Sequence, residues 1–383
     1  MINLLKLTIK ISIYNLLIMW FLSILIFSSC RNNDASAVNE LIHLSNEKLA
    51  ITVDPFGGAI SELYLTDDSL NFLNWQAKKE NMPPNNRKGA PFKGHFLCYG
   101  RWGAPTEGEI EAGIPHNGHH NNLMWNWEKL NEDNILMMDV ASDLEQYGIR
   151  RKVDLDENLP LFRFSEEFLH SGNLGRLSNI VQHVTIGPPF LNPSTRFYSN
   201  CGPGFLQESS YPDPVSYEYK WPFAKDSTGK AIDLSHFQTQ RNFVSTHIIE
   251  DEKGWIVAVD PVSGSFLGYI WNSIDYPWVN LWNHQENGMP VAYGMEFGTT
   301  GIGRPYDELL KKDTRFHNYS SFIFMDAGER AEKEFIGFAG RINGDFEEVE
   351  DITIDSFITV IFINSELNDR FPVKYDLKAL NAK

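Results

Sequence analysis

The feature that most constrains the fold is a succession of short runs rich in β-branched and aromatic residues, separated by clusters of Pro, Gly, Asn and Asp. Such runs, bounded by turn residues, predict β-strands. Helical periodicity is almost absent, apart from one short candidate helix at 306–311. The predicted strands are 50–53, 59–65, 135–140, 149–155, 161–169, 180–186, 255–259, 266–271, 291–297, 321–325, 334–338 and 352–363. The pattern predicts an all-β sandwich.

The organisation of the chain after about residue 41 indicates one domain. No internal repeat of fixed period, low-complexity tract or Ser/Gly-rich linker interrupts residues 41–383. This length is large for one domain but within the range of β architectures. We therefore expect a single β-sandwich domain over 41–383.

The N-terminus has the features of a lipoprotein signal peptide. Lys6 and Lys10 precede an apolar run at 16–27 that ends in Ser28-Ser29-Cys30, and polar residues follow at once. The run is short for a membrane span. It predicts a signal peptide over 1–29, lipidation at Cys30 and a polar tether over 30–40. The membrane would then be contacted only through the lipid anchor, in the bacterial cell envelope, on the periplasmic side or the outer-membrane surface. The alternative is an uncleaved N-terminal anchor.

Charge and cysteine content narrow the classes of partner. The net charge of −17 argues against nucleic acid and anionic membrane surfaces, which would repel the chain. Besides Cys30 only Cys98 and Cys201 are present, so one disulfide or two free thiols are both compatible with the sequence. No CxxC or Cys/His metal pattern occurs, and no metal is expected.

Aromatic residues point towards carbohydrate. The chain has ten Trp and fourteen Tyr, several of them next to turn-rich segments. Aromatic faces stack on the C–H faces of sugar rings. The tryptophans concerned are Trp75, Trp102, Trp125, Trp127, Trp221, Trp278 and Trp282. Each single tryptophan could instead pack in the core, so only the excess of tryptophans near turns as a group supports carbohydrate binding.

The densest polar segment predicts a binding loop. Tyr99-Gly-Arg-Trp-Gly-Ala-Pro105 is followed by Gly113-Ile-Pro-His-Asn-Gly-His-His120. Arg101 offers a fork of donors for sugar hydroxyls or a carboxylate. Alternatively, Arg101 caps the loop through backbone carbonyls. Loops this rich in Gly, His, Arg and Trp are typical of binding rather than of packing.

Two predicted strands each carry one titratable residue among apolar neighbours. His183 lies on the strand at 180–186, just before a Gly-Pro-Pro bend, and is either a satisfied core histidine or a catalyst. Glu296 lies within the strand at 291–297. A carboxylate there is either paired with Arg or Lys, or has the raised pKa that suits a general base.

At these segments the chain resembles the aldose 1-epimerase (galactose mutarotase-like) superfamily. The resemblance lies in the turn at 54–58 before a strand, in Gln182-His183, in Glu296, and in the His116-Asn117-Gly118-His119 loop followed by Trp125. It covers most of the chain from about 49 to 335. It implies a supersandwich of long antiparallel sheets, with a sugar or small carbohydrate bound across one of them.

The resemblance also implies a mechanism. Glu296 would take the proton of the anomeric hydroxyl while His183 protonates the ring oxygen, and the opened sugar would close to the other anomer. No metal or organic cofactor is needed. The remaining substrate-binding candidates are Arg101, Trp102, His116, Asn117, His119 and Trp282.

One departure from the family pattern bears on turnover. The histidine of the family's Pro-x-His-Gly loop falls on Asn117, which can hydrogen-bond an oxygen but cannot carry the proton. His116 or His119 would have to substitute. A carbohydrate-binding lipoprotein without turnover is therefore the competing hypothesis. A third is a metal-dependent hydrolase using His116, His119 and His120, which lacks the helix and glutamate of HExxH sites.

Overall fold

The computed structural model describes residues 40–130, 134–210, 215–226, 228–342, 346–354, 357–364 and 369–376. From Leu41 onward the chain forms one compact unit. The predicted signal peptide, Cys30 and nearly all of the tether lie outside the described residues. In the part that is described, no helix is long and apolar enough to cross a membrane.

The larger of two main sheets contains the strands on which the polar residues of interest lie. Its twelve strands are all paired antiparallel. In spatial order they are β1 (Ile42–Ser45), β2 (Leu49–Asp54), β3 (Ala59–Leu65), β4 (His95–Tyr99), β10 (Ile180–Ile186), β20 (Met289–Gly298), β19 (Trp278–Glu286), β16 (Phe243–Ile248), β12 (Pro203–Leu206), β13 (Tyr219–Lys220), β14 (Phe223–Lys225) and β15 (Ala231–Asp233).

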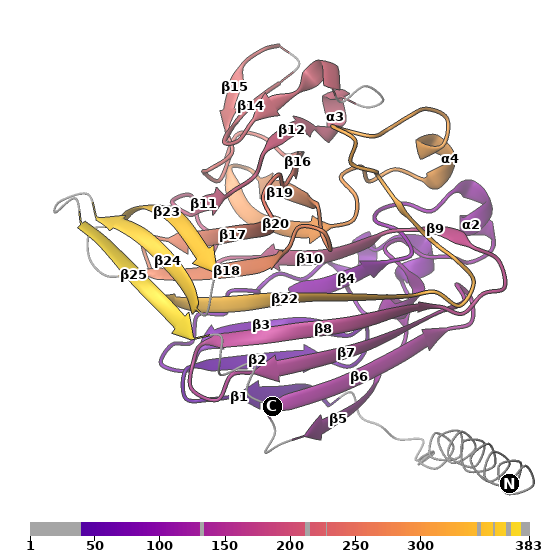
Figure 1. Ribbon diagram of the computed structural model, residues 1–383, viewed down its shortest axis with the longest axis horizontal. Coiled ribbons are helices and arrows are strands. Elements are labelled where there is room, and N and C mark those ends of the chain that lie inside the picture. Colours follow the sequence, from indigo (N-terminus) through magenta and orange to yellow (C-terminus); the bar gives the residue numbers. More distant parts are fainter. Residues whose placement is uncertain are drawn as a thin grey trace, which may run out of the picture. The chain divides into compact units, whose positions relative to one another are not determined.

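An eight-stranded antiparallel sheet packs against it (Figure 1). Its strands are, in spatial order, β11 (Arg196–Ser199), β17 (Lys253–Asp260), β18 (Ser265–Asn272), β22 (Arg330–Arg341), β8 (Leu161–His170), β7 (Tyr147–Leu155), β6 (Ile135–Ser142) and β5 (Asn126–Leu130). The main core lies between the two sheets, where Leu97, Val184 and Phe297 of the larger sheet meet Phe164 and Phe335 of the smaller one. The predicted all-β sandwich of antiparallel sheets is confirmed.

Two small sheets complete the described strands. One pairs β9 (Arg176–Ser178) with β21 (Ile323–Met325). The other comprises β23 (Phe346–Ile354), β24 (Phe357–Asn364) and β25 (Asp369–Asp376), and it buries Ile358 and Phe362 against Phe266 and Phe338 on the outer face of the eight-stranded sheet. The prediction of one strand over 352–363 is wrong, because β23 and β24 are antiparallel and the chain reverses between them. A continuous run of β-forming residues does not show where a strand turns.

Helices are few and short. They are α2 (Glu107–Glu111), α3 (Gln207–Ser210) and α4 (Tyr306–Leu309), with 3-10 turns η1 (Lys79–Asn81), η2 (Pro84–Asn86), η3 (His119–Asn122) and η4 (Val215–Tyr217). The helix α2 begins with a capping box, in which Thr106 and Glu109 bond each other's backbone N–H groups. The candidate helix at 306–311 is present as α4.

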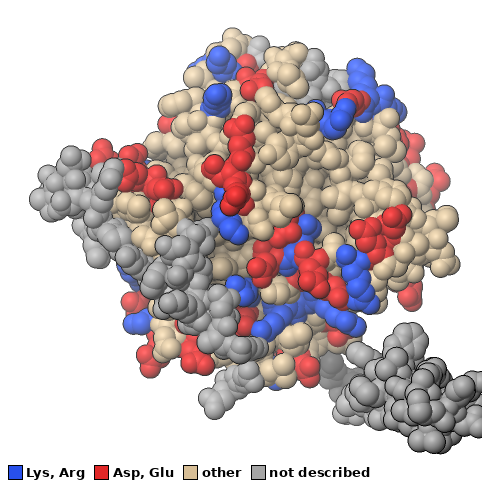
Figure 2. All heavy atoms as spheres, viewed as in Figure 1, with Lys and Arg blue, Asp and Glu red and all other residues tan. Residues whose placement is uncertain are grey.

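The outer face of the eight-stranded sheet is only partly covered. Beside the small C-terminal sheet, Figure 2 shows acidic and basic side chains mixed over β7, β8 and β22. Arg150 and Lys152 of β7 alternate there with buried residues, opposite Glu167 and Ser165 of β8. This is the alternation of a sheet with one face in the core and the other in solvent.

Strands β4 and β19 were not predicted from the sequence. The segment of β19, Trp-Val-Asn-Leu-Trp-Asn-His-Gln-Glu, is too rich in Asn, Gln and His to resemble a strand. Trp278 and Trp282, expected beside turns, lie within β19. The strand forms because β16 and β20 pair with it on both sides.

Candidate functional site

His183 occupies a strand that is buried on both faces. All seven residues of β10 are buried. Val184 and Ile186 face the core between the sheets, so alternation places Val181, His183 and Thr185 on the opposite face of the larger sheet. We call this the site face. On the adjacent strand β4, Phe96 is directly opposite His183 and stacks on its ring, with centroids 4.2 Å apart and planes 22° apart.

Glu296 reaches the same face from the neighbouring strand on the other side. In the pairing of β20 with β10, Phe297 lies opposite Gln182, and the Phe297 side chain faces the core. Glu296 therefore faces His183, and the His183 Nε2 to Glu296 Oε1 distance is 3.1 Å. The sheet hydrogen bonds, rather than a loop, bring these two residues together.

Each member of the pair has a second hydrogen-bond partner. The indole Nε1–H of Trp102 donates to Glu296 Oε2 at 2.9 Å. His183 Nδ1 lies 2.9 Å from the hydroxyl oxygen of Thr185. Trp102 comes from the loop after β4, and Thr185 is two residues further along β10.

The pair is desolvated. Only 1% of the Glu296 side chain and 11% of the His183 side chain are exposed. Burial raises the pKa of the Glu296 carboxyl well above its usual range, and the Trp102 hydrogen bond opposes this only in part. Burial lowers the pKa of the His183 imidazole to about 3. Both shifts favour a pair that holds one proton, on the carboxyl side of the contact with Nε2, and that has no net charge.

Two tryptophan side chains lie next to His183 on the site face. The Trp282 ring meets the His183 ring edge-on at 6.0 Å, and the half-buried Trp75 meets Trp282 in the same way at 5.5 Å. Gly294 lies beside them on β20, where a Cβ atom would be 2.8 Å from Glu296 Oε1 and 3.1 Å from the Trp282 Cβ. The absence of a side chain at this position lets the Glu296 carboxyl group and Trp282 pack closely against the β20 backbone.

A chain of amides and hydroxyls lies on the other side of Glu296. Asn280 of β19 is directly opposite Glu296, and its Oδ1 accepts a hydrogen bond of 2.9 Å from Thr246. Thr246 accepts in turn from Gln207, whose Oε1 accepts from the N–H of Gly303. These bonds fix the loop after β20 over the site face. Sequence analysis missed Asn280, because no strand was predicted at 278–286, and it also missed Gln207, which lies in α3.

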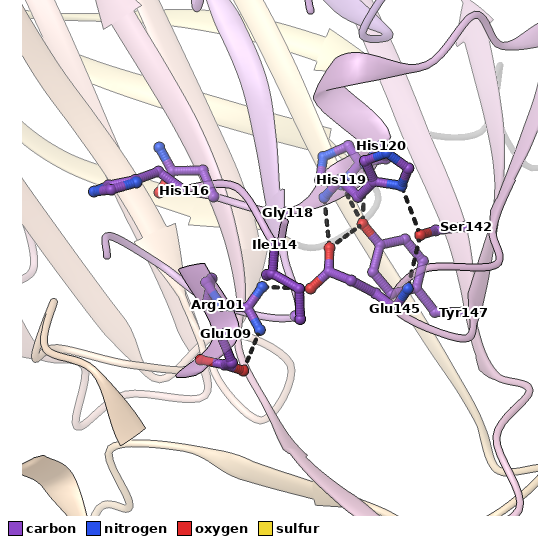
Figure 3. Close-up of polar contacts among 12 residues, drawn as sticks. Arg101, Glu109, Ile114, His116, Gly118, His119, His120, Ser142, Glu145 and Tyr147 are labelled. Atoms are coloured by element: carbon purple, nitrogen blue, oxygen red, sulfur yellow. Dashed lines mark hydrogen bonds and ion pairs between the residues drawn. The ribbon is translucent and has the colours of Figure 1, made fainter. Parts of the chain in front are cut away.

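Arg101, predicted to bind substrate, lies in a different buried cluster (Figure 3). Its guanidinium forms ion pairs with Glu145 and, at 2.7 Å, with Glu109. Glu145 also accepts from the Tyr147 hydroxyl at 3.1 Å and from the backbone N–H of His119 at 2.5 Å. We call Arg101, Glu145, Glu109 and His119 the Arg101 cluster. The Arg101 side chain is only 3% exposed, and its contacts join the loop after β4 to α2 and to the turn before β7.

The predicted loop residues follow the same pattern of internal contacts. Asn117 has a left-handed backbone (φ 60°), and its Oδ1 accepts from the Gly103 N–H at 2.7 Å. His119 Nδ1 lies 2.9 Å from the Ser142 hydroxyl. His116 is half-buried, and Figure 3 shows it apart from the dashed network of the Arg101 cluster. Burial and the Arg101 charge lower the pKa of His116.

The structure bears on the metal site and the disulfide considered from the sequence. His120 is buried, with Nδ1 at 3.0 Å from the Tyr147 hydroxyl and Nε2 at 2.8 Å from the Leu97 carbonyl. Within the described ranges no three His, Cys, Asp or Glu side chains are grouped so that they could hold a metal ion. Cys98 and Cys201 are free thiols, so of the two possibilities the structure has the unpaired one.

The structure thus brings together His183, Glu296, Trp102 and Trp282 of the predicted residues, and it places Arg101, Asn117 and His119 in contacts that hold loops. Sequence analysis missed Thr185, although a signal was present. Residues two apart on a predicted strand share a face, so a hydroxyl at 185 was a natural partner for the histidine at 183.

Comparison with known proteins identifies the fold. No family model and no curated protein matches the chain. Solved structures do match at low sequence identity. A galactose mutarotase related enzyme from Lactobacillus acidophilus is 11% identical, over 80% of this chain and 100% of that chain, with a TM-score of 0.57. A galactose mutarotase-like protein from Clostridium acetobutylicum is 13% identical, over 79% of this chain and 95% of that chain, with a TM-score of 0.56.

A candidate aldose 1-epimerase from Klebsiella pneumoniae is 14% identical over 77% of each chain, with a TM-score of 0.56. At such identities the likeness is one of fold, and activity does not follow from it. The fold implied by the sequence resemblance is confirmed. The chain is a β-sandwich protein with the galactose mutarotase-like fold, the fold shared by these structures.

Proposed function

We propose that the protein interconverts the anomers of a sugar or sugar derivative by general acid–base ring opening at His183 and Glu296. The observation that carries the proposal is the 3.1 Å contact between His183 Nε2 and Glu296 Oε1 on one sheet face. The anomeric hydroxyl and the ring oxygen are attached to the same carbon. An acid and a base that serve both oxygens must therefore lie side by side, as this pair does.

The reaction needs no net gain or loss of protons. The step starts from the form of the pair in which the proton lies on His183 Nε2 and Glu296 is ionised. Glu296 then takes the proton of the anomeric hydroxyl, the bond from C1 to the ring oxygen breaks, and His183 delivers its Nε2 proton to that oxygen. Rotation about C1–C2 and closure from the other face return both protons. A buried pair that shares one proton supports this exchange, because either heteroatom can hold it.

The surroundings of the pair suit a sugar ring. Trp75 and Trp282 are half-buried aromatic side chains next to His183, and aromatic faces stack on the C–H faces of sugars.

Anomer exchange in a panel of free aldoses, followed by NMR exchange spectroscopy or polarimetry, tests the proposal. We expect wild-type protein to accelerate exchange of at least one sugar. His183→Ala and Glu296→Ala should each lose about 100-fold to 10,000-fold of that rate. A wild-type rate equal to that of buffer for every sugar would refute the catalytic proposal.

A carbohydrate-binding protein without turnover is the second candidate. It is favoured by the 1% exposure of Glu296 and by Asn117, whose side-chain oxygen is bonded to the loop. This second candidate predicts no anomer exchange in wild type or in either variant. It also predicts that calorimetry detects glycan binding by the wild-type protein.

We also propose that the chain is attached to the cell envelope through a lipid on Cys30. The support is the sequence Ser28-Ser29-Cys30 after an apolar run. Metabolic labelling with a fatty acid should mark wild-type protein, and Cys30→Ala should abolish the label. Label that persists in the variant would contradict the assignment.

A further inference from the structure

The far side of the His183 imidazole has a partner that is not exposed to solvent. Thr185 is 0% exposed, and its hydroxyl oxygen lies 2.9 Å from His183 Nδ1. The backbone N–H of Thr185 donates to the Gly94 carbonyl at 2.9 Å, and Thr185 lies opposite Gly294 in the sheet. The position of this hydroxyl relative to the ring is therefore set by the strand itself.

The partner of one imidazole nitrogen decides the role of the other. A neutral imidazole carries its proton on Nδ1 or on Nε2, and the hydrogen bond at one nitrogen fixes which. Nε2 of His183 faces Glu296, so it is the nitrogen that exchanges a proton in the proposed reaction. For that, Nδ1 must hold its own proton throughout.

The charge of the pair points to the same arrangement. His183 and Glu296 share one proton, which lies either on the carboxyl or on Nε2. In the first state the ring is neutral and must offer a lone pair at Nε2, so its proton is on Nδ1. In the second state the ring is an imidazolium, with protons on both nitrogens. In both states Nδ1 is a donor, and a hydroxyl oxygen can accept from it.

We propose that Thr185 is a positioning residue for the acid–base pair. Its hydroxyl oxygen accepts a hydrogen bond from Nδ1–H of His183, which keeps the ring in the Nδ1–H tautomer and leaves Nε2 to exchange the proton with Glu296. The effect on turnover rests on the proposed function, whereas the tautomer does not.

Nitrogen NMR tests the tautomer directly. In full-length protein labelled with ¹⁵N-histidine, long-range ¹H–¹⁵N correlations distinguish a protonated from an unprotonated ring nitrogen, and His183→Gln assigns the signals. We expect protonated Nδ1 in wild type and in Thr185→Ser. In Thr185→Val the buried Nδ1–H would lose its hydroxyl acceptor, and this cost should outweigh the preference set by the shared proton, so we expect a shift towards protonated Nε2. Thr314→Val, which removes a buried hydroxyl bonded to Ser321, should leave the His183 signals unchanged.

Two results would overturn the inference. One is an Nε2–H tautomer in the wild-type protein. The other is an Nδ1–H tautomer that persists in Thr185→Val. If Thr185→Val fails to fold, the wild-type spectrum and that of Thr185→Ser still decide between the tautomers.

Kinetics provides the second measurement. Thr185→Val should lower kcat for anomer exchange on the order of tenfold or more, because a ring in the wrong tautomer cannot accept the proton, and it should leave KM within about twofold. Thr185→Ser should restore kcat and the wild-type pH profile. Equal rates in wild type and Thr185→Val would contradict the proposal. Absence of turnover in wild type would instead reject the proposed function and leave the NMR result standing.

Discussion

Two buried acid–base clusters among the described residues, the Arg101 cluster and the His183–Glu296 pair, hold their protons differently. In the Arg101 cluster, Arg101 bonds Glu145 and Glu109, and its charge and hydrogen bonds outweigh the effect of burial, so that the pKa of Glu109 is lowered. In the other cluster Glu296 bonds two neutral partners, His183 and Trp102. Burial there prevails and the pKa of Glu296 is raised.

The difference shows how one residue type serves two purposes. A buried carboxylate beside a guanidinium stays charged and ties loops together. A buried carboxyl beside an imidazole can pass its proton to the neighbour with little change in charge. We therefore expect substitutions in the first cluster to change stability and substitutions in the second to change chemistry.

The largest expected effect is on the rate of anomer exchange in Glu296→Gln. Glutamine keeps the shape and the hydrogen bond from Trp102 but cannot take a proton, so the rate should fall about 100-fold to 10,000-fold. The free energy of unfolding, from urea denaturation, should change by no more than about 1 kcal/mol, because the pair carries no net charge to be left unpaired. Strong destabilisation would erase the contrast between the clusters.

Arg101→Met should have the opposite profile. It leaves the buried Glu145 with only the more distant Arg176, at 3.9 Å, as a cation, which should lower the free energy of unfolding by about 3 kcal/mol. Arg315→Met is the matched control, since Arg315 and Asp313 form an exposed pair and its loss should change stability by less than about 1 kcal/mol. If both variants unfolded alike, the Arg101 cluster would not be the structural element described.

Acid sensitivity separates the clusters in a third way. Tyr147 bonds both Glu145 and His120, so His120 adjoins the Arg101 cluster. Burial lowers the pKa of His120 from 6.5 to about 3, so the unfolded chain binds one more proton than the folded chain between these values. Stability should therefore fall as the pH drops below 6.5, by up to about 1.4 kcal/mol per pH unit from this residue.

The His183–Glu296 pair should contribute no such slope between pH 4.5 and 6.5. In the unfolded chain the histidine holds one proton and the glutamate none, and in the folded chain the pair shares one. Urea denaturation from pH 4.5 to 6.5 should show a flatter profile for His120→Gln than for wild type. The double variant His183→Gln with Glu296→Gln should keep the wild-type slope, and a flattened slope there would show that the pair does not share a proton.

The smallest expected effect is that of Gly294→Ala. The new Cβ would lie 2.8 Å from Glu296 Oε1, so the carboxyl group must shift and anomer exchange should slow on the order of tenfold. Gly148→Ala, on β7, is the control, because the new Cβ would have no atom closer than 3.8 Å. Equal rates for Gly294→Ala and wild type would mean that the position of the Glu296 carboxyl group does not limit exchange.

The fold and the pair were predictable from the sequence, and most of the surrounding contacts were not. Single titratable residues in mostly apolar strands stood out at 183 and 296, because alternation and burial leave such residues few explanations. The role of Arg101 did not stand out, since its partner Glu145 lies in a turn far along the chain and only the fold brings them together. Asn280 was missed because β19 forms through its neighbours rather than through its own residue preferences.

The placement of His183 and Glu296 on adjacent strands has an evolutionary consequence. Their spacing is a property of the scaffold, held by the ladder between β10 and β20, whereas Trp75 and Trp102 come from connecting segments. Loops tolerate insertion and replacement far better than paired strands do. A lineage built on this chain can therefore exchange the walls around the His183–Glu296 pair without rebuilding the pair itself.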